Sequence, residues 1–213
     1  MAKPYFDAHV FRLIDAEAEL VEFKTLLETN VDLAEREQVL ARFRTCPNLC
    51  AMMGQYNVRL GIGDLIKREF RILPHFRTDL TVRRAGTDNI CLIEFEGASE
   101  RHIFEDSQRG VDTWARAFEK GFSQVVDWTW ALDHYRKTGD YVDAFGGDRP
   151  NIVGVLVIGR STALSTTVRK DRWEWRRNKV KADSFTLTLV TFDELYRDFE
   201  MWLGLRRMDA AAS

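Results

Sequence analysis

Two glutamates inside an otherwise apolar strand constrain this chain more than any other feature of its sequence. Residues 90–96 read Ile-Cys-Leu-Ile-Glu-Phe-Glu, and the turn-forming segment 85–89 precedes them. Glu94 and Glu96 are two residues apart, so both side chains point to the same face of the strand. Their apolar neighbours indicate a largely buried strand, in which free carboxylates are costly. The pattern therefore leaves two interpretations, a buried acidic site or an exposed acidic edge.

Asp79 lies on the preceding predicted strand and extends the acidic set to three. Carboxylates that converge on one sheet face repel each other and raise each other's pKa, and a divalent cation removes that cost. Magnesium takes one or two carboxylates together with water and phosphate, and it can activate water for attack on a phosphodiester. Asp79, Glu94 and Glu96 are therefore candidate ligands for Mg²⁺ or Mn²⁺. The alternative is an edge strand whose solvated acids prevent aggregation.

Whether the three acids lie on the same face of the sheet depends on the turn between the two strands. A turn centred between Thr87 and Asp88 opposes Asp79 to Glu96 and keeps Glu94 on the same face. A turn of odd length, centred on Thr87, would direct the Asp79 side chain to the opposite face. We therefore predict the even-length turn, or else a bulge near Asp79 that returns its side chain to the face of Glu94 and Glu96.

The order of predicted elements indicates a mixed α/β domain with a small sheet between helical layers. Asp32 is the expected cap of the second helix, and Thr191 with Glu194 forms a capping box before the last one. A loop is expected over 140–150. The apolar spacing predicts helices over 6–29, 33–44, a short segment from Pro47, 109–138, 165–181 and 191–205, and strands over 66–73, 77–84, 90–96, 151–158 and 185–190.

The length of 213 residues fits a single domain. Within it we expect a helical N-terminal part (1–60), a core (61–205) and a disordered tail (206–213). The N-terminus has no apolar signal core, and the longest apolar run, 152–158, is too short to span a membrane. We expect a cytoplasmic protein without a membrane partner.

The three cysteines fit reduced thiols in a cytoplasm. Cys46 and Cys50 are spaced for one helix face, but no second pair completes a zinc site, so buried apolar thiols are favoured.

The net charge of −2 provides no global basic field, so nucleic acid would need a local patch. Residues 160–181 hold eight basic and two acidic residues, interleaved with Trp173 and Trp175. Such a cluster can bind a phosphate backbone, or it can be a solvated helix face. For the two tryptophans we favour packing over base stacking. The candidate DNA contacts are Arg160, Arg169, Arg172, Arg176, Arg177 and Lys179.

Several motifs together resemble one known family. Asp79 followed by Glu94-Phe95-Glu96 resembles the PD-(D/E)XK nuclease pattern, and Gly121-Phe-Ser-Gln124-Val-Val-Asp-Trp128 resembles the glutamine-bearing helix of Shedu domains. Ile158-Gly-Arg-Ser161 and Val190-Thr-Phe-Asp-Glu-Leu195 are similar to that family's later motifs, which occur in the same order. The resemblance to the Shedu anti-phage family covers about residues 35–205.

The resemblance implies a restriction-endonuclease-like fold, with a mixed sheet flanked by helices and N-terminal helices added. It also implies Mg²⁺- or Mn²⁺-dependent DNA cleavage in defence against phage, and we expect a homo-oligomer. By position, Asp79 and Glu94 would be metal ligands, Glu96 a third ligand or a base, and Gln124 a residue that faces the site. The alternative is an inactive nuclease-fold module that binds DNA or a protein partner.

Two departures from the motif affect this expectation. Thr78 stands where the motif has proline, and Glu96 stands where it has lysine. Glutamate cannot supply a positive charge near the attacking water, although it can accept a proton or join a metal shell. Lys120 could reach in as a displaced lysine, but a solvated helix lysine is the more ordinary interpretation. His102 could touch the site, but a surface-loop histidine is more ordinary.

Overall fold

A six-stranded mixed sheet forms the centre of the molecule. The computed structural model describes residues 5–72, 76–108, 110–145, 147, 150–181 and 185–211. The strand order is β1-β2-β5-β6-β9-β10, antiparallel from β1 to β6 and parallel from β6 to β10. The strands are β1 (Asp7–Ala8), β2 (Leu65–Arg68), β5 (Leu80–Arg83), β6 (Asn89–Phe95), β9 (Asn151–Val157) and β10 (Thr186–Val190).

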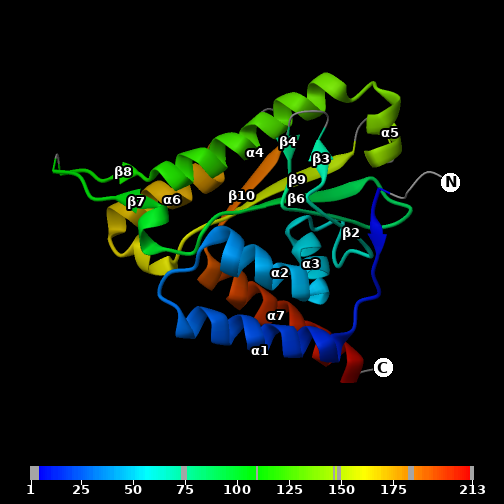
Figure 1. Cartoon of the computed structure of the whole chain (residues 1–213), viewed down its shortest axis with the longest axis horizontal. Coiled ribbons are helices and arrows are strands. Elements are labelled where there is room, and N and C mark those ends of the chain that lie inside the picture. Colours follow the sequence, from blue (N-terminus) through cyan, green and yellow to red (C-terminus); the bar gives the residue numbers. More distant parts are fainter. Residues whose placement is uncertain are drawn as a thin grey trace.

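Helices cover both faces of this sheet (Figure 1). One layer holds α1 (Leu13–Thr29), the π-helical turn η1 (Glu35–Leu40), α2 (Ala41–Thr45), α3 (Pro47–Met52) and α7 (Phe192–Ala211). The other layer holds α4 (Arg116–Tyr135), α5 (Gly139–Phe145) and α6 (Thr167–Lys179). Two small hairpins complete the fold: β3 (Arg71–Ile72) with β4 (Phe76–Arg77), and β7 (Phe104–Glu105) with β8 (Thr113–Trp114).

The α/β class predicted from the sequence is confirmed, because a mixed sheet lies between two helical layers. Odd-numbered residues of β6, such as Ile93, pack against α1 and α7, whereas Leu92 packs against α4. The first core joins Phe23 of α1 to Phe199 of α7, so the N-terminal helices and the rest of the chain share one core. Among the described residues, no helix is long and apolar enough to cross a membrane.

The predicted helix over 6–29 begins later than its apolar spacing indicated. Asp7 and Ala8 instead form the edge strand β1, paired with Ile66 and Leu65. Backbone pairing at an open sheet edge outweighs the helical spacing here. The expected cap by Asp32 is also wrong, since Ala34 is the N-terminal cap residue and makes no side-chain cap bond.

Other boundaries differ for identifiable reasons. The strand predicted over 66–73 breaks at Glu69, whose φ of 51° turns the chain into the β3–β4 hairpin. The helix predicted over 109–138 starts at Arg116, because Thr113–Trp114 pairs with β7. Residue 109 and part of the 140–150 loop lie outside the described residues. Within that segment α5 forms because Tyr141 and Phe145 are buried.

The disordered tail predicted over 206–213 is wrong for residues 206–211, which continue α7. Arg207 of that segment forms an ion pair with Glu17 of α1. Residues 212 and 213 lie outside the described residues.

The turn between β5 and β6 has the predicted parity but a shifted register. Leu80 pairs with Ile93 and Arg83 with Ile90. An even number of residues therefore separates Arg83 from its partner, as predicted. The register differs by two residues, and the ladder ends at the pair Leu80–Ile93. Asp79, one residue before β5, donates from its amide to Ile93 O instead of lying opposite Glu96.

Candidate metal centre

Glu94 is buried on the sheet face that α4 covers, with one carboxylate oxygen held and the other left without a partner. Gln124 of α4 donates from Nε2 to Glu94 Oε1 at 2.6 Å. Glu94 Oε2 is buried and has no hydrogen-bond partner among the residues that the structure describes. Burial raises the pKa of Glu94 well above its ordinary value, and repulsion from Asp79 and Glu96 raises it further. A buried acceptor without a donor is costly unless a proton, water or cation reaches it.

Asp79 immediately precedes β5, and its carboxylate turns toward the backbone of β6. Its Oδ2 accepts a hydrogen bond from the Phe95 amide at 2.8 Å, and its own amide donates to Ile93 O. Burial raises the pKa of Asp79 from 3.8 to about 7, although the bond from Phe95 opposes this shift. Among the described residues nothing donates to Asp79 Oδ1. Each of the two acids therefore retains one carboxylate oxygen without a donor.

Glu96 is in a different state, because a lysine neutralises it. Lys120 of α4 donates from Nζ to Glu96 Oε1 at 2.9 Å, and the Glu96 side chain is only 5 % exposed. Glu35 Oε2 lies 3.6 Å from the same Nζ. Burial raises the pKa of Glu96. The bond and charge of Lys120 oppose this rise, and the negative charge of Glu35 adds to it. Burial alone would lower the pKa of Lys120, yet its two acidic partners raise it.

The close approach of α4 to the acidic strand depends on a glycine. A Cβ at Gly121 would lie 3.0 Å from Glu96 Cγ and 2.9 Å from Leu156 Cδ1. Both atoms belong to buried residues, so a side chain at this position would push α4 away from the sheet. Gly121 thereby lets Lys120 and Gln124 reach two neighbouring glutamates.

The acidic motif implies a divalent metal ion, and the donor atoms of the site decide whether such an ion fits. Across the described ranges, no group of three or more histidine, cysteine, aspartate or glutamate side chains is arranged to hold an ion. The three predicted ligands therefore do not form a ready three-acid set, because Lys120 occupies Glu96. Asp79 and Glu94 do offer unpaired oxygens, and magnesium needs no more than one or two carboxylates. The donor set thus fits a magnesium site that is completed by water and phosphate.

Sequence reasoning missed Glu35. Leu33 and Ala98 form an isolated bridge with reciprocal amide bonds, and this bridge brings the start of η1 beside the end of the acidic strand. Glu35 then lies over the site from a position more than forty residues before Asp79. Within the predicted helix 33–44 it looked like an ordinary surface acid, so no local signal identified it.

Five of the six predicted DNA contacts make contacts within the protein. Arg160 binds Asp193 and two carbonyls at the end of α1, and Arg169 pairs with Asp106 and Asp112. Arg172 donates to Asp112 O and lies over the Trp114 ring. These residues stabilise the fold, an outcome that neither interpretation of the basic segment anticipated.

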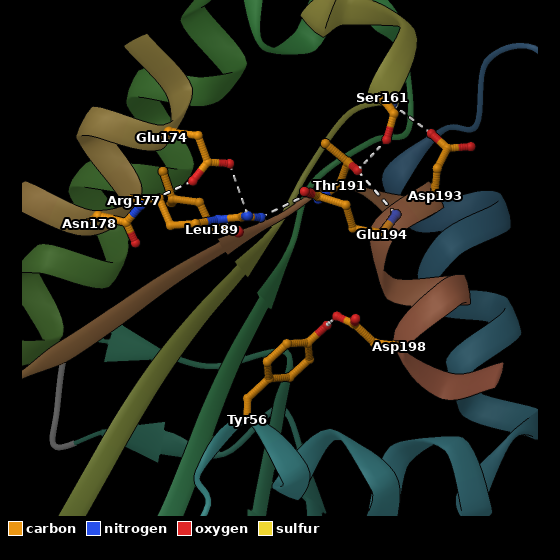
Figure 2. Close-up of polar contacts among 10 residues, drawn as sticks. All are labelled: Tyr56, Ser161, Glu174, Arg177, Asn178, Leu189, Thr191, Asp193, Glu194 and Asp198. Atoms are coloured by element: carbon orange, nitrogen blue, oxygen red, sulfur yellow. Dashed lines mark hydrogen bonds and ion pairs between the residues drawn. The ribbon is translucent and has the colours of Figure 1, made fainter. Parts of the chain in front are cut away.

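Arg176 and Arg177 also make their contacts within the protein. Arg176 binds both oxygens of Glu119 and stacks on the Phe122 ring. Arg177 pairs with Glu174 and Glu194 and donates to Leu189 O (Figure 2). Lys179 is exposed and makes no ion pair among the described residues. The segment is helical as predicted, but little of its charge is free for phosphate.

The predicted capping box is confirmed and belongs to a larger polar network (Figure 2). The Thr191 amide donates to Glu194 Oε2 at 2.8 Å, and the Glu194 amide donates to Thr191 Oγ1 at 3.2 Å. Ser161 Oγ lies 2.8 Å from the same threonine hydroxyl. Arg177 binds Glu194 from α6, so the network ties both helical layers to the ends of β9 and β10.

The two tryptophans of α6 lie in different environments. Trp173 is buried, as predicted, but Trp175 is 61 % exposed and its predicted packing is wrong.

His102 packs against Gly97, to whose carbonyl its Nδ1 bonds at 2.7 Å, and not against the acids. All three cysteines are free and buried as expected, and burial raises the pKa of Cys50 to about 12.

The family described as "Shedu protein SduA, C-terminal" matches residues 17–196, which is most of the chain. No curated protein matches it. The matched range includes Glu35, Asp79, Glu94, Glu96 and Gln124.

Proposed function

Because this chain belongs to the Shedu SduA C-terminal family, which points to anti-phage defence, we propose that it is a metal-dependent DNA endonuclease. In this proposal it has the PD-(D/E)XK type of site, and its substrate is the phosphodiester backbone. The homo-oligomer expected from the sequence stays a prediction.

One observation carries the proposal. Glu94 is buried, with Oε1 fixed by Gln124 and Oε2 without a donor among the described residues, and it is repelled by Asp79, whose Oδ1 also has no described donor. Two acids that repel each other, here the buried Glu94 and the half-buried Asp79, destabilise a fold unless they serve a ligand. A divalent cation is the ligand that would satisfy both.

Asp79 and Glu94 would hold the ion, and Gln124 orients Glu94 for that task. The bound ion would lower the pKa of a water molecule and neutralise charge on the phosphate. The Phe95 amide fixes one oxygen of Asp79, so only the other would face the ion. The dry surroundings of Glu94 strengthen these interactions by excluding solvent.

Lys120 would supply the charge that the motif lysine normally provides. It reaches the position after Glu94-Phe95 from the helix instead of the strand, where Glu96 binds it at 2.9 Å. Its side chain is 58 % exposed, so it can contact a phosphate without leaving the site. Glu96 would then position Lys120, and the role of third ligand or base that was expected for Glu96 becomes secondary.

The second candidate is an inactive module that keeps the fold and binds DNA or a protein. The Lys120–Glu96 pair favours it, because a neutralised glutamate stabilises the site without any metal. Metal binding separates the two functions.

The test is a Mn²⁺ titration followed by electron paramagnetic resonance. We expect one ion bound per chain by the wild type, and at least about tenfold weaker binding by Glu94→Gln, which keeps the shape but removes the charge. Asp193→Asn, at a structural ion pair away from the site, is the matched control and should bind as the wild type does. Equal Mn²⁺ binding by the wild type and Glu94→Gln would favour the inactive module.

A further inference from the structure

Glu69 joins two arginines that come from different parts of the chain. Its Oε1 lies 3.6 Å from Arg44 Nη2, and its Oε2 lies 3.2 Å from Arg77 Nη1. All three side chains are more than half exposed. Across the described residues, Arg44 donates no hydrogen bond, and the Arg77 side chain donates to Glu69 alone. One carboxylate therefore bridges two guanidiniums, and the cluster keeps one positive charge.

The backbone at Glu69 adopts a conformation that is uncommon for a glutamate. Its φ of 51° lies in the left-handed region, which glycine and asparagine adopt more readily. Two backbone bonds hold the bend, from the Glu69 amide to Asp79 O at 3.0 Å and from the Thr78 amide to Phe70 O at 2.9 Å. Residues held in strained conformations concentrate at functional sites, which indicates a role for the Glu69 side chain.

The cluster borders the acidic site. Arg44, Glu69 and Asp79 line one small cavity of about 20 Å³, which is room for about one water molecule. Arg77 precedes Asp79 by two residues in the sequence. A ligand of the two arginines would therefore lie next to the acid that is expected to hold the ion.

The backbone of Arg77 is also tied to the site by Gln124. The Nε2 atom of Gln124 donates to Arg77 O at 3.4 Å and to Glu94 Oε1 at 2.6 Å. One side chain therefore contacts both the arginine and the buried acid.

Other arginines near the site and on α6 are already bound. Arg68 lines the same cavity, but its guanidinium donates to Phe43 O at 3.2 and 3.3 Å. The arginines of α6 pair with acids outside that helix, as described above. Arg44 and Arg77 differ from them because they share a single exposed carboxylate.

A phosphodiester has the features that the two arginines contact in Glu69. It carries one negative charge and two free oxygens, and each oxygen can accept from one guanidinium. An exposed ion pair contributes little free energy, so a phosphate can replace the carboxylate at small cost.

We propose that Arg44 and Arg77 bind a phosphate of the DNA backbone next to Asp79, and that Glu69 occupies this position while DNA is absent. We name the two arginines the arginine clamp. The proposal rests on the proposed function for its choice of DNA. It adds where the strand crosses the site and which carboxylate the strand must displace.

The direct test measures the salt dependence of duplex binding in EDTA, where no metal-dependent cleavage occurs. Anisotropy of a labelled duplex of about twenty base pairs gives the affinity at each salt concentration. Arg44→Gln with Arg77→Gln should reduce the log–log slope by about 0.9, the value for one lost phosphate contact. Lys170→Gln with Lys179→Gln removes the same charge from exposed positions of α6 and should leave the slope nearly unchanged. Equal reductions in both double variants would overturn the proposal, because only overall charge would then matter.

The second arm removes the competing carboxylate. Glu69→Gln keeps the shape of the side chain and should tighten duplex binding about two- to fivefold, since an exposed ion pair of ordinary strength no longer competes. Glu28→Gln makes the same charge change at another exposed ion pair, with Lys24 on α1, and should change the affinity much less. Equal gains in the two variants would contradict the role proposed for Glu69.

Combining the variants shows whether Glu69 acts through the arginine clamp. In the background of Arg44→Gln with Arg77→Gln, Glu69→Gln should no longer tighten binding, because the cations that the phosphate would gain are absent. An undiminished gain in that background would mean that Glu69 acts only by its charge, which contradicts the proposal. The substituted side chains are all more than half exposed, and circular dichroism checks that each variant is folded.

Inorganic phosphate distinguishes a DNA strand from a free anion, because both offer the same chemistry. At constant ionic strength, replacing chloride by about 10 mM phosphate should leave the melting temperature of the wild type unchanged, since a single ion lacks the other contacts of a strand. The opposite result is a rise in melting temperature that Arg44→Gln with Arg77→Gln abolishes, together with duplex binding that this double variant leaves unchanged. That result would assign the clamp to a free anion and overturn the proposal.

The outcomes also separate this inference from the proposed nuclease. The binding arms need no metal and can be repeated in Glu94→Ala. If they succeed but no cleavage is found with Mg²⁺ or Mn²⁺, the arginine clamp stands and the nuclease assignment fails. If Asp79-dependent cleavage is found but the clamp variants change neither slope nor affinity, the nuclease stands and the arginine clamp fails.

Discussion

Lys120 and Glu96 form a charge pair across two elements, with 2.9 Å between Nζ and Oε1. The lysine comes from α4 and the glutamate from the end of β6. The positive charge therefore approaches the site from the helix, whereas a lysine at position 96 would approach it from the strand. Gly121 permits the approach. The motif has a lysine at the position of Glu96, and Lys120 brings a positive charge to that position from α4. Exchanging the two residues tests this arrangement.

The first prediction is that exchanging the two charges preserves function. Lys120→Ala should lower the rate of DNA cleavage by about 10²-fold, because it removes a positive charge from the developing transition state. Glu96→Lys combined with Lys120→Glu should recover most of that loss, since a lysine then stands at the strand position. Cleavage rates under single-turnover conditions provide the measurement. Lys120→Glu alone is the control, and an exchange that cuts no faster than that control would contradict the claim that a lysine at the strand position can replace Lys120.

The second prediction concerns stability, pH and metal. The pKa of Asp79 rises from 3.8 to about 7 on folding, so the folded protein binds this proton more tightly. The stabilisation linked to the proton, roughly 4 kcal/mol at most, is complete below pH 3.8 and is lost as pH rises through about 7. Mg²⁺ should therefore raise the melting temperature at about pH 8 and have little effect at about pH 5.

Asp79→Asn is the control for this behaviour. It should flatten the pH dependence of the metal-free melting temperature and reduce the response to Mg²⁺. An Asp79→Asn variant that responds to Mg²⁺ as the wild type does at both pH values would place the ion elsewhere.

How far the sequence predicted the site can be seen from individual residues. Glu94 was predicted from the pattern of its strand and Gln124 from the family resemblance, and the structure joins the two side chains by a hydrogen bond. Glu35 was not identified, because its position depends on the Leu33–Ala98 bridge between segments far apart in the chain. Local patterns report which residues a strand or helix presents, whereas contacts between distant segments depend on packing.

The arginines of α6 illustrate the same limit. The helix and its charge were predicted from residues 165–181, but the acids that bind Arg169 and Arg176 are Asp112 and Glu119, each 57 residues away in sequence. Charge counts within a window cannot include such partners. The register of β5 against β6 was likewise off by two residues, because alternation fixes the parity of a hairpin and leaves its length to the turn.

The third prediction is that Arg176 contributes to stability and not to DNA affinity. Arg176→Ala removes a bidentate bond to Glu119 and stacking on Phe122, and it should lower the free energy of unfolding by about 2 kcal/mol. Urea denaturation measures this change. Lys179→Ala, at an exposed position on the same helix, should stay within about 0.5 kcal/mol of the wild type. A stable Arg176→Ala variant with weakened DNA binding would restore the original interpretation of the basic segment.

The fourth prediction tests the capping box of α7. Thr191→Ala leaves the Glu194 amide without its acceptor and should destabilise the protein by about 1 kcal/mol. Thr191→Ser keeps the hydroxyl and should recover most of this loss. The comparison is made by thermal or urea denaturation. If serine and alanine destabilise equally, burial of the threonine methyl explains the residue better than its hydrogen bonds.

The central claim, that Asp79 and Glu94 form a metal site for cutting DNA, is tested most directly by plasmid cleavage. Supercoiled DNA is incubated with the protein and Mg²⁺ or Mn²⁺, beside Asp79→Ala and Glu94→Ala variants whose folding is checked by circular dichroism. We expect nicked or linear DNA with the wild type, none in EDTA, and none with either variant. Cleavage by either variant at the wild-type rate would contradict the claim, and a folded wild type that cuts with neither metal would favour the inactive binding module.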